Sequence, residues 1–337
     1  MAKNYSNKKG SASLIFTWIL IILLAIGSFM VLENYNDNHT NLVKNKEIVQ
    51  LLAEKTGKDV GDITKEDLSS IEMISIYPQL DYMQLIQADG TLSISPDQEL
   101  PYVNYVSLGL KGYLDATDNE TAENLVVTYP GDINSIKDDL ALFTGIKSFE
   151  LIDYTGAMPE FDLKTLSADT FKNIEYLTLE GYNVSSFASI ADHKLLKGVS
   201  LSGINDEDLA IVKNITTLET LFVAGEKITD ASPVEEITTL KNLAITGTSI
   251  KNIPSLEKLV NLETVDFSDN NLTDISPLSA LNAEKITKVS ITGNAIEDFS
   301  PISHIDEKKI TKDQPEEEST DETTESESID SETISVE

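Results

Sequence analysis

The chain has 337 residues, enough for two or three domains or for one elongated domain, and carries 25 basic against 57 acidic side chains, a net charge of -32. Every basic residue is lysine, so no guanidinium group is available to clamp phosphates, and the negative charge disfavours nucleic acid as a partner. The lack of cysteine excludes disulfide bonds, thiolate nucleophiles and cysteine-based zinc or iron–sulfur sites.

The first predicted element is an apolar segment near the N-terminus. Residues 14–32 carry no charge, and a helix of 19 residues spans about 28 Å, close to the hydrocarbon thickness of a bilayer. Three lysines precede this segment and acidic residues follow it, so the positive-inside rule places residues 1–10 in the cytoplasm and the repeats outside. We predict that residues 11–32 form an uncleaved single-pass anchor in the cell membrane. A secretory signal peptide cut after Gly27 and a pilin-like leader cut after Gly10 are the alternatives.

A linker over residues 33–47 leads to a predicted helical cap. The pattern predicts one helix that ends near Gly57 and a second, short helix that is capped by Thr64, with Asp67 three residues on. A cap is needed because the first coil of a repeat array would otherwise expose its apolar edge. We assign residues 48–145 to this cap together with degenerate repeats.

The degenerate repeats are inferred from a spacing of apolar residues that fades toward the N-terminus. Residues 77–100 and 112–121 are expected to be loops or irregular insertions, and Leu125 and Val127 are expected to mark another, weaker coil of the array. The spacing is kept by two triplets: Ile71, Ile74 and Ile76, and Val103, Val106 and Leu108.

Residues 146–305 form a repeat array. Segments of eleven residues recur, mostly 22 residues apart, with apolar or aromatic residues at positions 1, 4 and 6 and usually glycine at position 8. A glycine column at the end of a short strand suits a repeated tight turn, because glycine adopts positive φ freely. The segments begin at Ile146, Ile174, Leu196, Leu218, Leu240, Leu262 and Ile286.

These columns resemble the 22-residue leucine-rich repeats of internalin-like bacterial surface proteins. Residues 261–281 carry the fullest match, including its Asp-Ile-Ser-Pro-Leu ending. The buried asparagine of that family is kept only at Asn270 and Asn294, so backbone groups or water must satisfy the other turns. The resemblance implies an α/β leucine-rich repeat solenoid, with a parallel sheet on the concave face and short or irregular convex segments.

The concave face is the predicted binding surface. Side chains at positions 3, 5 and 7 of each eleven-residue segment point away from the core. Most of them are small or carry a hydroxyl group, and the two large rings are those of Tyr176 and Phe222. Seven strands about 4.8 Å apart make a groove of about 29 Å, which suits a protein or glycan chain better than a metabolite. In the competing interpretation, the two exposed rings are ordinary features of a protein surface and do not mark a binding site. The candidate ligand-binding residues are Tyr176, Thr178, Glu180, Ser200, Phe222 and Asp266.

We find no set of residues typical of catalysis, so we expect no catalytic residues, no cofactor and no metal. The three histidines are far apart, no phosphate-binding or nucleophile motif occurs, and Asp266, Asp269 and Asp274 do not match a calcium loop. Residues 306–337 are acidic and hydroxyl-rich, which is typical of a disordered tail that serves as a spacer or binds divalent cations weakly.

Together these features predict a non-catalytic, surface-exposed repeat protein, held at the bacterial membrane through residues 14–32, that binds a protein or glycan ligand. The resemblance suggests adhesion or interaction with a host. The alternative is a structural or assembly accessory of the envelope, with the array as a scaffold, and an enzyme is the least favoured class. The sequence predicts neither the identity of the ligand nor the oligomeric state.

Overall fold

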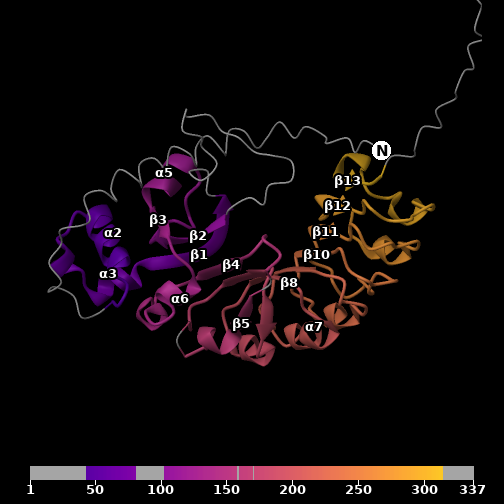
Figure 1. Ribbon diagram of the computed structural model, residues 1–337. Coiled ribbons are helices and arrows are strands. Elements are labelled where there is room, and N and C mark those ends of the chain that lie inside the picture. The colour runs from indigo at the N-terminus through magenta and orange to yellow at the C-terminus, as the bar shows by residue number, and fades with distance from the viewer. Residues whose placement is uncertain (1–42, 81–101, 158, 170, 314–337) are drawn as a thin grey trace, which may run out of the picture.

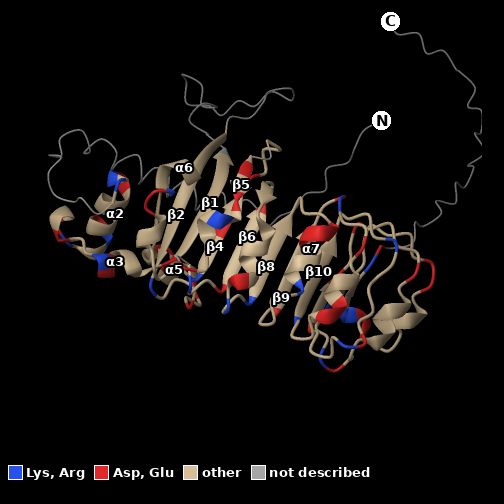
Figure 2. Cartoon of the chain, turned by 90° about the horizontal axis from the view of Figure 1, so that it is seen from below, with Lys and Arg blue, Asp and Glu red and all other residues tan. Residues whose placement is uncertain are grey.

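A computed structural model describes residues 43–80, 102–157, 159–169 and 171–313, which form one curved solenoid (Figure 1). The strands of its main sheet line the inner side of the arc, and most of the short helices lie on the outer side. Charged residues gather mostly on the turns and helices around the sheet (Figure 2). The anchor predicted over residues 11–32 lies outside the described residues. Within the described part of the chain, no helix has the length and apolar character needed to cross a membrane.

The N-terminal cap begins with helix α2 (Lys46–Thr56). Asn45 precedes the helix and accepts hydrogen bonds from two amides of its first turn, and Gly57 ends it with a φ of 70°. The carboxylate of Asp139, which is 1% exposed, accepts from the backbone N–H groups of Lys44 and Asn45 at 2.8 Å each. The predicted first helix and its end at Gly57 are therefore confirmed, and a buried carboxylate attaches its start to the rest of the cap.

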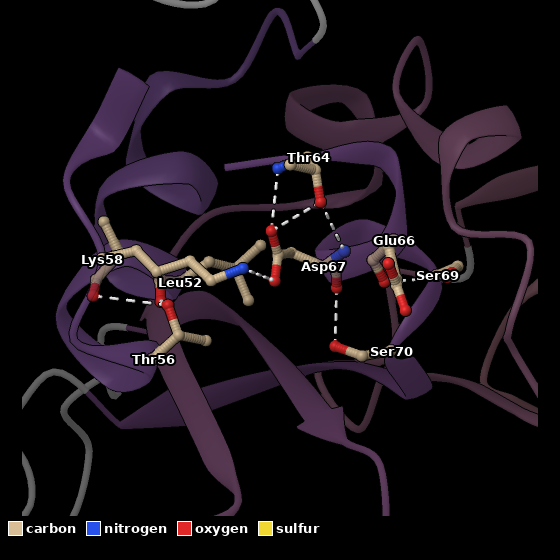
Figure 3. Close-up of polar contacts among 9 residues, drawn as sticks. Leu52, Thr56, Lys58, Thr64, Glu66, Asp67, Ser69 and Ser70 are labelled. Carbon is tan, nitrogen blue, oxygen red and sulfur yellow. Dashed lines mark hydrogen bonds and ion pairs between the residues drawn. The ribbon is translucent and has the colours of Figure 1, made fainter. Parts of the chain in front are cut away.

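A short 3-10 turn, η2 (Val60–Asp62), leads to the second predicted helix, α3 (Lys65–Ser69). Thr64 and Asp67 form the predicted capping box: the Thr64 side chain accepts from the amide of Asp67, and the Asp67 carboxylate accepts from the amide of Thr64 (Figure 3). Lys58 adds an ion pair to the same carboxylate at 2.6 Å. The capping box marks the start of this helix, and the buried side chain of Leu68 attaches it to the core.

The next strands differ from the sequence prediction. Strand β1 (Ile71–Leu80) pairs antiparallel with β2 (Tyr102–Leu110), which pairs antiparallel with β3 (Val126–Pro130). The two triplets expected to mark degenerate repeats thus lie on adjacent antiparallel strands rather than on successive coils. Positions 4 and 6 of a repeat share a face in any strand, so a buried antiparallel strand imitates this part of the pattern.

The segments expected to be loops are also partly regular. Residues 77–80 continue β1, and 119–121 begin helix α5, whereas 81–101 lie outside the described residues. Val127, expected to mark a further weak coil of the array, lies on β3, which pairs antiparallel with β2 and is therefore not a repeat strand. The short helices of this region are α5 (Asn119–Asn124), α6 (Ile133–Ile136) and η3 (Leu140–Leu142).

The seven predicted repeats are all present as parallel strands in one register. In that register the residues at position 4 lie side by side, as Leu177, Val199, Leu221, Leu243 and Val265 do. The strands are β4 (Ser148–Ile152), β6 (Tyr176–Glu180), β8 (Gly198–Ser202), β9 (Thr220–Ala224), β10 (Asn242–Thr246), β11 (Thr264–Asp266) and β12 (Lys288–Ser290).

The convex segments are short, as predicted. Most are single 3-10 turns, and one coil has an α-helix instead. They are η4 (Leu163–Leu166), η5 (Phe187–Asp192), α7 (Asp206–Val212), η6 (Ser232–Glu236), η7 (Ser276–Ala280) and η8 (Ser300–Ile302), with a small parallel sheet of β5 (Glu160–Asp162) and β7 (Asn183–Ser185).

The apolar side chains of all coils form one continuous core from Val43 to Ile305. Strand positions 4 and 6 supply its concave side, and the 3-10 turns supply its convex side. In the coil that starts at residue 262, all seven apolar anchors are at most 5% exposed: Leu262, Val265, Phe267, Leu272, Ile275, Leu278 and Leu281.

Asn270 connects the turns of two coils. Its Oδ1 accepts from the amide of Thr248, and its Nδ2 donates to the carbonyl oxygens of Ile245 and Phe267 at 2.6 and 2.9 Å. Backbone bonds also join successive turns: the amide of Gly203 donates to the carbonyl oxygen of Ala224, and the amide of Asp269 donates to that of Thr292. This bond occurs in coils with and without asparagine, so the substitution of backbone or water for the missing asparagines stays a prediction.

The end of the array lies further along the chain than predicted. Residues 306–313, assigned from their composition to a disordered tail, form η9 (Glu307–Lys309) and β13 (Ile310–Thr311), which pairs parallel with β12. The carboxylate of Asp313 accepts from the amide of Gly293 at 2.8 Å. The sheet order is thus β13-β12-β11-β10-β9-β8-β6-β4-β1-β2-β3. The prediction of a tail is wrong for these eight residues, and residues 314–337 lie outside the described part.

Replacing Asn270 by alanine should destabilise the fold by about 3 kcal/mol, because the amide of Thr248 and the carbonyl oxygen of Ile245 lose the partner that this side chain supplies. Urea unfolding of the full chain, followed by circular dichroism, measures the effect. The matched control is Thr273→Ala, at an exposed position nearby, for which we expect a change below about 0.5 kcal/mol. A loss below about 1 kcal/mol at Asn270 would show that this side chain is not essential to its turn.

Candidate functional site on the concave face

The concave face holds an open depression of about 490 Å³, which we call the central groove. It crosses the parallel strands from β6 to β12, and its side walls are mostly small or polar. Four of the six predicted residues line it, namely Glu180, Ser200, Phe222 and Asp266. The other two, Tyr176 and Thr178, lie on β6 outside its lining.

The ring of Phe222 is the main apolar feature of the central groove. It is 43% exposed and lies in register between Ser200 on β8 and Ala244 on β10. These two neighbours are small, so a ligand can cover the exposed part of the ring. Tyr176 is 44% exposed and lies in register with Gly198, where a Cβ atom would come within 2.7 Å of its ring. Glycine at residue 198 therefore makes room for this second ring.

Polar side chains of the groove are held by one another. The hydroxyl of Ser200 on β8 donates to the carboxylate of Glu180 on the neighbouring strand β6 at 2.8 Å. Thr264 of the lining donates to the side-chain oxygen of Asn242 beside the groove at 2.8 Å, and the amide of Asn242 donates to Thr220 at 3.1 Å. These groups are fixed before any ligand arrives, which lowers the entropic cost of binding.

Alternating charges mark the start of β1 and of the parallel strands from β4 to β11. Lys147 pairs with Glu72 at 2.8 Å, and hydrogen bonding to this glutamate raises the pKa of the lysine. Two further pairs repeat the pattern along the sheet, so lysine and glutamate neutralise one another at this edge, although exposed pairs of this kind add little stability. In order across the sheet, the series is Glu72, Lys147, Glu175, Lys197, Glu219, Lys241 and Glu263.

A second depression, of about 590 Å³, lies at the N-terminal end of the same face, and we call it the tyrosine depression. Its lining includes Tyr77, Tyr102, Tyr113 and Tyr154 together with Glu150. The sequence analysis did not find this site. Tyr77 and Tyr113 belong to the segments expected to be loops or irregular insertions, and the antiparallel pairing of β1 with β2 brings Tyr77 and Tyr102 to the sheet. The available signal was the density of tyrosine between residues 77 and 154.

Glu150 is the carboxylate of the tyrosine depression. Burial raises its pKa, and the negative charge of Glu180 acts in the same direction, whereas a hydrogen bond from Ser75 opposes both. Within the described part of the chain, no lysine forms an ion pair with Glu150. The arrangement therefore holds a carboxylate without a cationic partner among aromatic rings.

Among the described residues, no group of three or more histidine, aspartate or glutamate side chains could hold a metal ion. The polar groups of the two depressions can form hydrogen bonds and attract positive charge.

The comparisons with known proteins agree with the repeat fold. Residues 238–280 match the family model for leucine-rich repeats, in two copies. The predicted resemblance to leucine-rich repeat proteins is confirmed. No curated protein matches the chain.

Solved structures similar to the chain include three proteins of Listeria monocytogenes. Internalin C2 is 20% identical, with a TM-score of 0.49 and coverage of 82% of this chain and 100% of its own. Internalin F is 18% identical, with a TM-score of 0.43 and coverage of 77% and 73%. An internalin-like protein is 15% identical, with a TM-score of 0.43 and coverage of 81% and 67%.

The raised pKa of Glu150 predicts that Glu150→Gln stabilises the protein at neutral pH. A folded-state pKa above the unfolded value means that the folded chain binds the proton more readily, so this group makes stability fall as pH rises between the two values. Glutamine removes the buried charge, so the urea midpoint should rise at pH 7. The gain should vanish below the ordinary glutamate pKa of about 4.3, where both states are protonated.

Glu226→Gln, at an exposed glutamate in the turn after β9, is the control and should leave the midpoint unchanged. A lower midpoint for Glu150→Gln at pH 7 would contradict the predicted destabilising effect of the Glu150 charge.

Proposed function

We propose that the protein is a non-catalytic binding protein that receives an extended polypeptide or glycan along its concave face. The observation that carries this proposal is the central groove, with the exposed ring of Phe222 among small, prearranged polar side chains. We further propose that residues 14–32 hold the repeats at the outer side of a cell membrane, on the length and charge pattern of that segment.

The ring of Phe222 has the properties of an anchor for a ligand. Aromatic side chains combine a large apolar area with few rotatable bonds, and they dominate binding energy where smaller contacts surround them and exclude water. The neighbours of Phe222 in register, Ser200 and Ala244, are small enough to allow such close contact. Tyr176 offers a second ring two strands away, and both rings favour a ligand that crosses several strands.

The shape of the face favours a polymer. Seven parallel strands about 4.8 Å apart give a surface of about 29 Å across the repeats, longer than a typical metabolite. The side chains at positions 3, 5 and 7 of the repeats include hydroxyl and amide groups as well as apolar groups. A peptide or sugar chain, which repeats its own polar groups, could bind such a mixed surface.

The resemblance of the repeat columns to internalin-like surface proteins favours adhesion or interaction with a host as the setting. The alternative is a scaffold within the producer's own envelope, which uses the same face for a neighbouring membrane protein. The two differ in where the ligand comes from, and an experiment on the intact chain separates them.

A photoreactive phenylalanine analogue placed at residue 222 of the full chain should form adducts with the ligand. The same analogue at residue 260, in the turn before β11 and outside the groove lining, where valine is 63% exposed, is the matched control and should form none. Mass spectrometry of the adducts, made separately with host extract and with the producer's envelope, identifies the source. Equal adducts at both positions, or none at residue 222 in either extract, would contradict the proposal.

The ligand so identified should bind the Phe222→Ala variant at least about 10-fold more weakly, since a central aromatic contact contributes about 1.4 kcal/mol or more. The side chain is partly exposed, so the variant should unfold at the same urea concentration as the parent. An unchanged affinity would remove Phe222 from the site.

A further inference from the structure

We propose that the tyrosine depression binds the positively charged side chain, lysine or arginine, of a basic protein partner. This depression lies beside the central groove and has its own lining, so the inference holds whether or not a polymer binds along that groove. Three features support it: the origin of the rings, their prearrangement and the carboxylate at their centre.

The rings come from separate parts of the fold. Tyr77 lies on β1 and Tyr102 on β2, whereas Tyr113 follows β2 and Tyr154 follows β4. The antiparallel β1–β2 pair and the parallel β1–β4 pair bring all four to one depression around Glu150. Tyr154 is 63% exposed and Tyr102 is 44% exposed, so large aromatic surfaces are open to a ligand.

Two of the rings are held in place by the sheet. The hydroxyl of Tyr77 is 3.2 Å from that of Ser107, which is 2.7 Å from the hydroxyl of Thr128. The ring of Tyr113 lies over Gly109, where a Cβ atom would come within 2.8 Å of it. These contacts fix part of the aromatic wall before binding, so less freedom is lost when a ligand arrives.

The charge of the depression selects a cation. Glu150 lies in register with Ser75 on β1 and Thr178 on β6. Lys147, which directly precedes the strand of Glu150, forms its ion pair with Glu72 instead. The carboxylate is partly withdrawn from water without a counter-ion, which is costly unless a ligand supplies the charge. Glu180 adds a second negative charge nearby.

Aromatic faces and a carboxylate together match an organic cation. The negative face of each ring attracts a cation, and the carboxylate supplies a direct ion pair, whereas an anion is repelled by both. A divalent metal ion needs several oxygen ligands, and Glu150 is the single carboxylate in the lining. The net charge of -32 further favours encounter with a basic protein surface.

The test uses the full chain and the tripeptide acetyl-Gly-Lys-Gly-amide. Its neutral counterpart has norleucine, which keeps the apolar stem and lacks the ammonium group, and a third peptide has arginine. Binding is followed through the NMR signals of tyrosine rings labelled with ¹³C. We expect saturable shifts with the lysine or arginine peptide and at least about 10-fold weaker binding of the norleucine peptide.

The variants separate binding from structure. Glu150→Gln should weaken binding of the charged peptides at least about 10-fold while it raises the urea midpoint, a combination that a merely structural residue would not give. Tyr154→Leu, at an exposed position, should weaken binding about 5-fold without unfolding the chain. Val260→Ala, at an equally exposed position outside the tyrosine depression, and Glu226→Gln should bind as the parent does.

The inference is overturned if the norleucine peptide binds as tightly as the lysine and arginine peptides, or if no peptide moves the ring signals at tens of millimolar. It is also overturned if folded Glu150→Gln keeps the parent's affinity.

Discussion

The structure depends on an apolar core that no single coil can complete. Each coil offers a few buried side chains from its strand and from its convex turn, too few to offset the entropy of ordering its residues. Stacked coils bury one another's apolar surface, and the core extends without a break from Val43 to Ile305. The two ends must then be closed. Helices α2 and α3 and the antiparallel strands close the first, and β13 extends the sheet at the second.

This constraint also explains where binding chemistry is located. The side chains at positions 4 and 6 of each repeat are buried in the core, so the residue type can vary only at positions 3, 5 and 7 of the strand. These positions carry Phe222 and Glu180 in the central groove and Glu150 in the tyrosine depression. The core therefore fixes the spacing of the strands, and the exposed positions determine what each part of the face can bind.

Periodic and local features of the fold could be predicted from the sequence. The seven repeats follow from recurring apolar columns, and α3 follows from the Thr64 and Asp67 capping box, because both depend on residues close in sequence. The antiparallel β1–β2–β3 arrangement could not be predicted, since a strand's two-residue period is the same in either direction. Strand β13 was missed because composition over residues 306–337 concealed the short segment around Ile310, which packs against the core.

Of the two depressions on the concave face, the central groove could be predicted from the sequence and the tyrosine depression could not. Four residues of the central groove follow from strand position alone, because the register is regular from β6 to β12. The tyrosine depression depends on contacts between residues far apart in sequence, such as Tyr102 and Glu150, and no periodic pattern reports such contacts.

The central claim is that the coils share one core, and hydrogen exchange of a Leu243→Ala variant tests it most directly. Leu243 is buried in β10, at the middle of the array, and its truncation should cost about 2–5 kcal/mol. The account predicts that amides of β6 and β12, on either side, lose protection together with those of β10. Loss of protection confined to β10, with β6 and β12 as slow to exchange as in the parent, would contradict a shared core.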